Sequence, residues 1–443
     1  MSAKRVAVVG AGISGLVAAA EIVRAGHEVR VFEAGAHLGG HTNTVTVAEG
    51  ERELMVDTGF IVFNDRNYPN FEQILAELGV ASQPSTMSFG VSDEDGEFEW
   101  STRGPLGLFA IASNLANPKF LRMFADIAKF NREASALLDT DEIGPSLRQF
   151  LAQNDFSEYF IERLLVPQAS SVWSTYPSQL WEFPARFLAE FFENHGTLQF
   201  RNRPQWRTIV GGSKRYIEPL CKPFEERIEL ETPVRAIHRT GNGVRVETDG
   251  HSADFDEVVI ASHSDQAIEM LGEPTAAEAE ILGAIPYKRN EAVLHTDASI
   301  MPKRRAAWAS WNFHLRAERV TETTLTYDMN RLQSLDARRS YLVTLNRTED
   351  IDPDRIIRRI DYSHPVFTEA GMAAQARWGE ISGVDRVHYC GAYWRWGFHE
   401  DGAWSGLRVS EALGGRGPGL GGAVVPEVRK RAAVDPRALE MAS

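Results

Sequence analysis

The chain has 443 residues, of which 43% are hydrophobic and 24% are charged, as is usual for globular proteins with a hydrophobic core. At roughly 150 residues per domain, this length predicts two or three domains. The net charge of −14 argues against a general nucleic-acid-binding protein, because phosphate contacts require a basic surface. The composition therefore excludes the disordered and fibrous classes and disfavours a nucleic acid partner.

The cysteine content and the N-terminus indicate a compartment. Cys221 and Cys390 lie far apart and outside any Cys/His cluster, so neither a disulfide scaffold nor a structural metal site is predicted. Residues 1–5 lead directly into a predicted strand without a signal-peptide cleavage region, and no run of about 18 apolar residues occurs. We therefore expect a cytoplasmic protein whose membrane contact is at most peripheral.

The first elements form a strand–helix–strand pattern. An apolar strand is predicted over residues 6–9, a helix over residues 13–24 and a second strand over residues 28–32. The uninterrupted apolar run is typical of a strand that is buried on both faces of a parallel sheet. Glu33 ends the second strand, where a carboxylate accepts hydrogen bonds from ribose hydroxyls. This order predicts a βαβ unit at the start of an α/β fold.

The turn between the first strand and the helix has a Gly-x-Gly-x-x-Gly pattern, at Gly10, Gly12 and Gly15. Gly10 permits the tight turn, Gly12 lets a pyrophosphate approach the backbone, and Gly15 lets the helix pack closely on the strand. The helix N-terminus adds amide donors and the positive end of the helix dipole. With Glu33 at the required spacing, the pattern predicts a dinucleotide-binding site.

The residues after Glu33 distinguish FAD from NAD. Gly39 and Gly40 follow the acid by six and seven residues, and this arrangement resembles the flavin-containing amine oxidase superfamily. An Arg commonly follows these glycines in that superfamily, whereas this chain has His41. Backbone amides and Thr42 are therefore expected to make the phosphate contact at this point.

Further segments resemble the same superfamily from one end of the chain to the other. Residues 55–60 are similar to the strand and turn beneath the flavin ring, and residues 397–406 are similar to the loop and helix that close over it. The resemblance implies an oxidoreductase with non-covalently bound FAD. The implied cofactor residues are Gly10, Gly12, Ile13, Ser14, Gly15, Glu33, Ala34, Gly39, Gly40, His41, Thr42, Thr58, Gly59, Val234, Gly391, Asp401, Gly402 and Trp404.

The resemblance also implies the architecture. It indicates an α/β fold in which a Rossmann-like FAD-binding domain, of the amine oxidase and glutathione reductase type, carries a discontinuous mixed α+β substrate domain. The glycine-rich C-terminal segment is expected to be an extension with a short helix near residues 425–433. We expect the FAD-binding domain over residues 1–65, 205–285 and 385–415, the substrate domain over residues 66–204 and 286–384, and the extension over residues 416–443.

Several short blocks resemble a narrower bacterial branch of the superfamily, among them residues 169–174, 194–196, 203–207 and 397–402. Members of this branch are typically encoded beside methyltransferases that resemble cyclopropane-fatty-acid synthases. The activity that this resemblance implies is that of the flavin-dependent desaturase of furan fatty acid biosynthesis, which converts a methylated monounsaturated acyl chain into a methylated conjugated diene. A lipid or fatty acyl substrate and a lipid methyltransferase partner are therefore expected.

Two segments are compatible with a lipid substrate. One helical pattern places Phe120, Leu121, Phe124, Ile127 and Ala128 on one face and Lys119, Arg122, Asp126 and Lys129 mostly on the other. This pattern is typical of a helix in a membrane interface, although a helix packed on its own core has it too. With the resemblance, it predicts helices near residues 104–130 that contact the inner face of the cell membrane. The aromatic run over residues 181–192 suits either the wall of an acyl tunnel or an ordinary core.

Catalytic candidates follow from the chemistry of flavin dehydrogenation, which removes a hydride and a proton and holds the reacting carbons about 3–3.5 Å from the flavin. His399 and Glu400 are the first candidates for a base, because their motif adjoins the flavin face in the superfamily. His295 and Asp297 are the second candidates. Oxygen and a quinone remain alternative electron acceptors.

Two other functions remain open. Oxidation of a small amine would require an aromatic cage beside the flavin, for which Tyr393, Trp394 and Trp396 are candidates. Alternatively, the chain could be a flavin-bearing partner of a lipid methyltransferase without turnover of its own.

Overall fold

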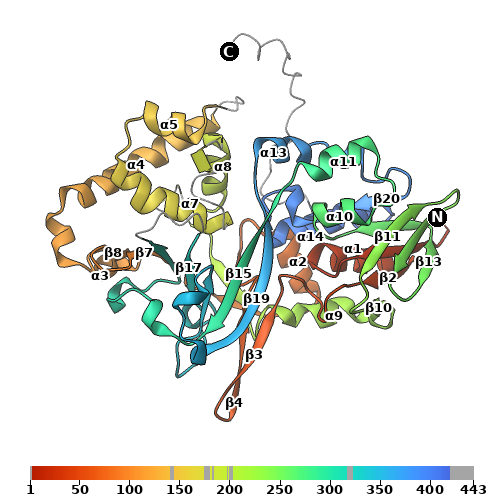
Figure 1. Ribbon diagram of the computed structural model, residues 1–443, viewed down its shortest axis with the longest axis horizontal. Helices are drawn as coiled ribbons and strands as arrows, with labels where there is room; N and C mark the ends of the chain where they lie inside the picture. Colours follow the sequence, from red (N-terminus) through yellow and green to blue (C-terminus); the bar gives the residue numbers. More distant parts are fainter. Residues whose placement is uncertain are drawn as a thin grey trace, which may run out of the picture.

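The computed structural model describes residues 2–139, 144–173, 180–181, 184–196, 198, 203–316 and 323–419 (Figure 1). One half of the molecule is built on a five-stranded sheet of order β10-β2-β1-β14-β20, in which all neighbouring strands are parallel. Its strands are β10 (Ile228–Glu229), β2 (Glu28–Phe32), β1 (Arg5–Val9), β14 (Glu257–Ile260) and β20 (Val387–Tyr389). The sheet therefore combines the beginning, the middle and the end of the chain.

Two helices from opposite ends of the chain pack against each other beside this sheet. They are α1 (Ile13–Arg24) and α14 (His399–Ala412). A Cβ atom on Gly406 would lie 2.4 Å from the carbonyl oxygen of Ser14, so only glycine permits this approach. The helix α2 (Pro69–Glu77) packs on α14, and α9 (Ile217–Cys221) packs on α1.

The other half contains a seven-stranded sheet in which β7 and β16 are parallel and the remaining neighbours are antiparallel. Its two longest strands, β15 and β19, run between the halves in Figure 1. In sheet order the strands are β19 (Ile356–Pro365), β15 (Tyr287–His295), β18 (Leu342–Leu345), β17 (Leu325–Asp328), β16 (Trp311–Leu315), β7 (Phe89–Asp93) and β8 (Glu99–Ser101).

A group of helices covers one face of the seven-stranded sheet and shares an aromatic core with it. The group consists of α4 (Pro118–Leu138), α5 (Leu147–Gln153), α6 (Glu158–Phe160), α7 (Val166–Trp173) and α8 (Ala185–Asn194). A π-helical turn over Ile161–Leu165 joins α6 to α7 just before Pro167. Proline has no backbone N–H for the regular helical bond, which accounts for the wider turn here.

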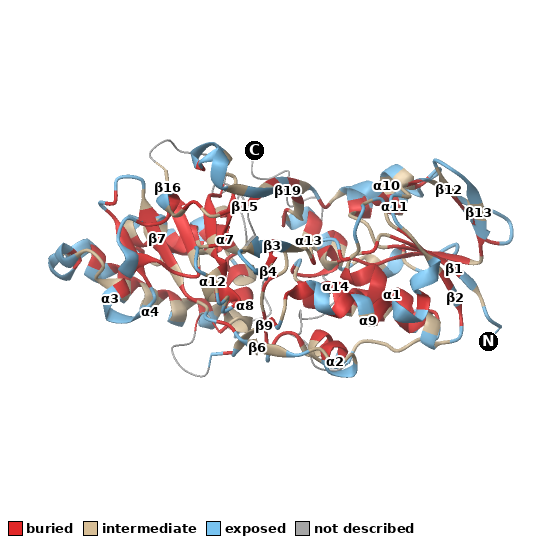
Figure 2. Cartoon of the chain, turned by 90° about the horizontal axis from the view of Figure 1, so that it is seen from below, coloured by how far each residue is buried: buried red, intermediate tan, exposed pale blue. Residues whose placement is uncertain are grey.

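Figure 2 shows that buried residues gather in two regions, one around α1 and α14 and one around α4, α7 and β7. Smaller sheets connect the halves or extend the first one. They are the hairpin of β3 (Thr44–Glu49) and β4 (Arg52–Asp57), the sheet of β5 (Phe63–Asn64), β9 (Trp206–Ile209) and β6 (Ser82–Pro84), and the sheet of β11 (Val234–Arg239), β12 (Val244–Thr248) and β13 (Ser252–Phe255).

The α/β class with a Rossmann-like cofactor unit, predicted from the sequence, is confirmed. Within the described residues, no helix is both long and apolar enough to cross a lipid bilayer. The helix expected near residues 425–433 lies outside the described residues, as do Ser174, Glu182 and Phe183 of the sequence blocks named above.

Candidate active site

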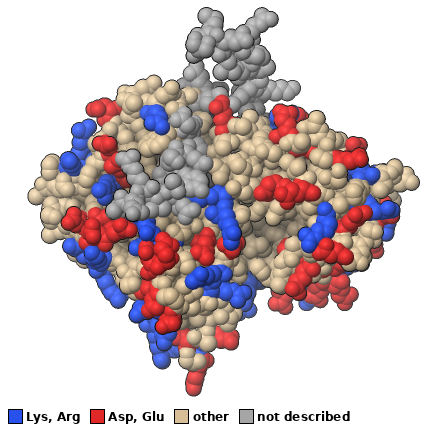
Figure 3. Space-filling model, viewed as in Figure 1, with Lys and Arg blue, Asp and Glu red and all other residues tan. Residues whose placement is uncertain are grey.

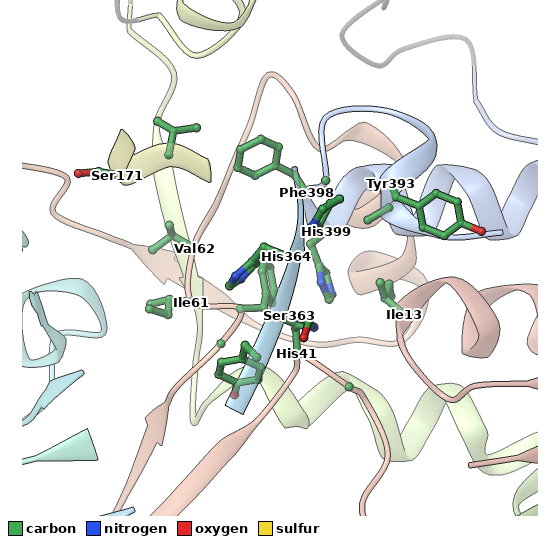
Figure 4. Close-up of a pocket in the computed structure, with 18 of the residues that line it drawn as sticks. Ile13, His41, Ile61, Val62, Ser171, Ser363, His364, Tyr393, Phe398 and His399 are labelled. Atoms are coloured by element: carbon green, nitrogen blue, oxygen red, sulfur yellow. The ribbon is translucent and has the colours of Figure 1, made fainter. Parts of the chain in front are cut away.

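A cavity of about 1530 Å³ extends from the glycine-rich turn after β1 into the group of helices. Figure 4 shows Ile13 and Tyr393 on one side of the view and Ile61, Val62 and Ser171 on the other, with His41, His364 and His399 between them. The cavity therefore joins the two halves of the molecule, and each half contributes one end of it.

The end of the cavity at the five-stranded sheet has the geometry of a dinucleotide site. The Glu33 carboxylate accepts hydrogen bonds from the backbone amides of Ala11 and Gly35, at 2.7 Å each. The amide of Gly39 donates to the carbonyl of Ala11 at 2.8 Å, which holds the Gly39-Gly40 loop against the glycine-rich turn. The two glycine motifs of the sequence thus form one surface of the cavity.

The surroundings of Gly12 show whether this surface has room for a bound dinucleotide. Gly12 caps helix α1 without a side-chain hydrogen bond, which leaves the first amides of the helix unmatched by any cap. A Cβ atom on Gly12 would have no neighbour within 4 Å, so the glycine leaves open volume in the cavity wall. Open volume, free amides and a ribose-binding acid are the features that a flavin dinucleotide requires.

The position that is commonly Arg in the superfamily is a buried histidine here. The ring of His41 stacks on Tyr362 at 4.7 Å and lies 5.3 Å from His364. Burial lowers the pKa of His41 far below its usual value, and the neighbouring His364 and His263 lower it further. Its Nε2 atom has no hydrogen-bond partner in the described part of the chain, so a polar ligand could satisfy it.

Twelve of the eighteen expected cofactor residues line the cavity; they are Gly10, Gly12, Ile13, Ser14, Glu33, Ala34, Gly39, Gly40, His41, Gly59, Val234 and Gly391. The other six lie behind its wall. Gly15 packs under the turn, where a Cβ atom would meet the carbonyl oxygen of Gly10 at 2.0 Å, and Gly402 packs on Ile13.

The remaining four expected cofactor residues form contacts within the protein. The hydroxyl of Thr42 bonds to that of Tyr216 at 2.7 Å, and Thr58 donates to the carbonyl of Asn43. The carboxylate of Asp401 accepts the amide of Phe398, and the Trp404 ring lies under the guanidinium groups of Arg395 and Arg408. These residues support the wall of the cavity from behind.

Of the four catalytic candidates, His399 is the one that lines the cavity. Its ring stacks on Phe60 at 3.7 Å, and its Nε2 atom lies 2.9 Å from the hydroxyl of Tyr216. Burial lowers the pKa of His399 to about 3, so the imidazole is neutral near pH 7.

Glu400 is adjacent in sequence but faces helix α2. Its carboxylate accepts hydrogen bonds from the side-chain amide of Asn70 at 2.6 Å and from the backbone amide of Phe71 at 2.9 Å. Burial raises the pKa of Glu400 to about 7, although these hydrogen bonds oppose the shift. The contacts are those of a residue that holds the N-terminus of α2.

His295 and Asp297 lie together at the end of β15, away from the residues that line the cavity. The His295 ring bonds to the hydroxyl of Thr344 at 2.8 Å, and Asp297 accepts hydrogen bonds from the amides of Ser299 and Asp352. These contacts fix the turn that follows the strand.

His195, at the end of α8, lines the cavity and was not among the sequence candidates. Its Nδ1 atom lies 2.9 Å from the carbonyl oxygen of Phe191, and the two rings stack at 3.9 Å. Because a carbonyl only accepts, Nδ1 carries the proton and Nε2 carries the lone pair. Burial lowers the pKa of His195 to about 4. The sequence offers no signal for this role beyond the 194–196 block.

Beyond His195, the helices line the cavity with apolar side chains. We call this region the helical arm; it consists of Phe124, Ile127, Phe130, Phe160, Leu164, Leu165, Val172, Phe191 and Phe192, with the uncharged polar residues Asn131, Gln168 and Ser171. Two residues of the aromatic run over 181–192 thus line the cavity, whereas Leu188 is part of the core.

The expected aromatic cage is divided. Tyr393 lines the cavity, whereas Trp394 packs in the core beside the five-stranded sheet and Trp396 packs on Phe187 at 4.4 Å.

The fold and the site together define a protein with a binding site suited to a flavin dinucleotide. Residues 13–295, more than half of the chain, match the family model described as flavin containing amine oxidoreductase. The chain therefore belongs to the flavin-containing amine oxidase family, whose members use FAD.

A Mycobacterium tuberculosis protein named as a flavin-containing monoamine oxidase, AofH, is 26% identical over 272 residues, which are 58% of this chain and 56% of that protein. The chain thus matches little more than half the length of this relative.

Two solved structures cover 93% of the chain, each with a TM-score of 0.65. Cyclohexylamine oxidase from Brevibacterium oxydans is 18% identical and covered over 99% of its length. The CLA-producing fatty acid isomerase from P. acnes is 16% identical and covered over 98%. At these identities the likeness shows the fold alone.

Proposed function

We propose that this protein is an FAD-dependent desaturase that converts a methylated, unsaturated acyl chain of a phospholipid into a conjugated diene. The observation that carries the proposal is the helical arm, an apolar extension of the same cavity that contains the dinucleotide site. An acyl chain in this arm would bury its methylene groups, each worth about 0.8 kcal/mol.

The placement of the carboxylates along the cavity argues against a cationic substrate in the helical arm. The carboxylates among its described lining residues are Glu33, Glu269 and Asp361, and none of them belongs to the helical arm. Glu33 is bound to backbone amides, and Asp361 pairs with Arg289 at 2.6 Å. An ammonium group in the arm would therefore lack a counter-charge, and burying it there would be costly.

A protein of the same fold acts on a related substrate. The P. acnes structure is named as a fatty acid isomerase, so this fold accommodates an enzyme of fatty acids. That likeness supports the acyl substrate without identifying its chain length or double-bond position.

When bound, the flavin supplies the acceptor for a hydride. The residues of this chain then have three tasks. The helical arm positions the acyl chain and excludes water. The Nε2 lone pair of His195 accepts the proton that leaves with the second C–H bond. The hydrogen bond between the Tyr216 hydroxyl and His399 Nε2 holds the His399 ring flat against Phe60 at the cavity wall.

Phe398 brings these residues close to one another. Its ring lies 5.3 Å from His195 and 5.4 Å from Phe191, and it directly precedes His399. The helical arm therefore meets the cofactor half at this residue.

Reduction of the bound flavin without oxygen tests the proposal. A phospholipid that carries a methylated monounsaturated chain is expected to bleach the visible absorbance of the flavin. The product is expected to show the ultraviolet absorbance of a conjugated diene and a mass lower by two hydrogens. If the flavin stays oxidised with such lipids, the proposal is wrong.

Oxidation of a small apolar amine is the second candidate, because Tyr393 lines the cavity and the AofH relative is named as a monoamine oxidase. Bleaching by amines and not by lipids would identify this function. Bleaching by neither, together with binding to a lipid methyltransferase, would identify a flavoprotein partner.

A further inference from the structure

Three exposed leucines lie close together in the sequence at one end of the molecule. Leu106 is 81% exposed, Leu115 is 59% exposed and Leu121 is 45% exposed. We call these three residues the leucine patch. The other large hydrophobic residues that are exposed within the described ranges are distant from one another in sequence: Val210, Leu230, Ile357 and Val384.

The leucine patch spans three consecutive elements. Leu106 lies in α3 (Gly104–Leu108), Leu115 in a 3-10 turn over Ala112–Ala116, and Leu121 in the first turns of α4. The rings of Phe109 and Phe120 lie 6.2 Å apart and link the segment before α4 to its first turn. In Figure 1 this segment forms the left-hand end of the molecule, and Figure 2 colours much of it as exposed.

The charge around the leucine patch opposes that of the whole chain. The residues between positions 103 and 133 include two carboxylates. Asp126 is buried and accepts the amide of Ser157, and Glu133 pairs with Arg132 at 2.7 Å. The left-hand edge of the surface in Figure 3 is mostly uncharged, with Asp and Glu as well as Lys and Arg beside it. The cations of the segment are Arg103, Lys119, Arg122, Lys129 and Arg132, in a chain whose net charge is −14.

Two of these cations can meet an external anion at the surface, one without an ion pair among the described residues and the other beside two carboxylates. No ion pair of Lys119 occurs within the described part of the chain, and Arg122 lies 3.9 Å from Asp126 and 3.8 Å from Asp155, with 56% of its side chain exposed. The nearby Arg304 contributes no net charge, because it pairs with Glu99 at 3.1 Å.

The same elements also line the cavity. Leu108 in α3 and Phe124 and Ile127 in α4 line the helical arm side of it, two to six residues from Leu106 and Leu121. Leu121 and Phe124 are three residues apart on α4 and therefore lie on neighbouring faces of the helix, so the leucine patch adjoins the residues that line the cavity.

We propose that the leucine patch and the cations beside it form a docking surface for an anionic lipid bilayer, and that α3 and α4 then lie between the bilayer and the cavity. Exposed apolar side chains next to lysine and arginine bind such interfaces by burial and by attraction to anionic headgroups. The route into the cavity rests on the proposed function, whereas the docking surface does not.

Sedimentation of the FAD-loaded protein with vesicles tests the docking surface. The protein is expected to sediment with vesicles that contain phosphatidylcholine and phosphatidylglycerol. It is expected to sediment only weakly with vesicles of phosphatidylcholine alone. The triple variant Leu106→Ser, Leu115→Ser and Leu121→Ser is expected to bind about tenfold more weakly or worse. The double variant Lys119→Gln and Arg122→Gln should bind anionic vesicles more weakly, by about fivefold for each cation removed. Its binding to uncharged vesicles should not change.

A matched control replaces three exposed hydrophobic residues elsewhere, by Leu230→Ser, Ile357→Ser and Val384→Ser. This variant is expected to sediment like the unchanged protein. The docking surface is overturned if the unchanged protein fails to sediment, if the leucine variant sediments as well as the control, or if both variants lose binding equally. A partner protein as the true occupant would produce the first of these results.

Flavin reduction separates this inference from the proposed function. Reduction by detergent-dispersed lipid without sedimentation would overturn the docking surface alone. Sedimentation without reduction by any acyl substrate would refute the desaturase and leave the docking surface in place. A leucine variant that reacts with dispersed lipid but no longer with vesicle lipid would support both.

Discussion

The hydroxyl of Tyr216 lies 2.9 Å from Nε2 of His399 and also bonds to Thr42, so one tyrosine links helix α14 to the loop after Gly39-Gly40. Both partners are buried, and removing the hydroxyl would leave two polar groups unsatisfied. Tyr216→Phe is therefore expected to lower the free energy of unfolding by about 1–3 kcal/mol and to change the visible spectrum of the flavin.

The control for this variant is Tyr389→Phe, which removes a buried hydroxyl that donates to Glu278 instead. It should destabilise the protein to a similar degree, measured by urea unfolding, with an unchanged flavin spectrum. Equal spectra for the two variants would show that Tyr216 has no influence on the cofactor.

His195→Asn keeps a donor near the carbonyl of Phe191 but removes the basic Nε2 atom. If that atom accepts the proton, flavin reduction by lipid is expected to slow by about 10²–10⁴-fold while the flavin content stays the same. His27→Asn, at a buried histidine bound to the carbonyl of Leu413, is the control and should leave the rate unchanged.

The pH dependence gives a second readout for His195. Its pKa is lowered to about 4, so its lone pair is available throughout the range above that value. The rate should not fall because of this group between pH 7.5 and about 5.5. A tenfold loss per unit below about pH 6.5, absent from His195→Asn, would contradict the lowered pKa while supporting His195 as the base; the same loss in both proteins would show that another group titrates.

Glu400→Gln is expected to change stability rather than chemistry. The pKa of Glu400 is raised to about 7 in the folded protein, so the folded state binds a proton that the unfolded state releases above about pH 4.5. The stability from this group is full below about pH 4.5 and is lost as the pH rises towards about 7, at up to about 1.4 kcal/mol per unit. Urea unfolding from pH 5 to 8 should show that the variant lacks this slope, with a rate of flavin reduction close to normal.

Two glycine variants separate cofactor binding from folding. Gly12 has φ −72° and ψ 176°, which valine adopts readily, and a Cβ atom there meets no protein atom. Gly12→Val is therefore expected to fold with a normal unfolding transition but to lose its flavin. Gly15→Val should fail to fold, because its Cβ atom would lie 2.0 Å from the Gly10 carbonyl. A yellow Gly12→Val protein would falsify the placement of the dinucleotide.

The sequence predicts those site residues whose positions are fixed by nearby residues in the chain. Gly10, Gly12 and Glu33 act through spacings fixed by a single βαβ unit, so the pattern carries over directly into the structure. Thr42 and Asp401 owe their positions to Tyr216 and Arg395, and no short-range pattern reveals such partners.

His399 and Glu400 are adjacent in sequence, but their side chains point to different parts of the structure. Successive residues of a helix point about 100° apart, so one faces the cavity and the other faces α2. His195 shows the reverse case. It reaches the site because α8 ends beside Phe398, about two hundred residues further along the chain, and only the tertiary fold brings them together.

The position of β20 and α14 has a consequence for biosynthesis. Both belong to the cofactor half, yet they are formed by residues 387–412. During translation, at about 5–20 residues per second, the βαβ unit is synthesised first. The strand β20 and the helix α14, which complete this half, follow much later. FAD can be enclosed only after residues 387–412 have left the ribosome, so the preceding residues are all synthesised before the cofactor is enclosed.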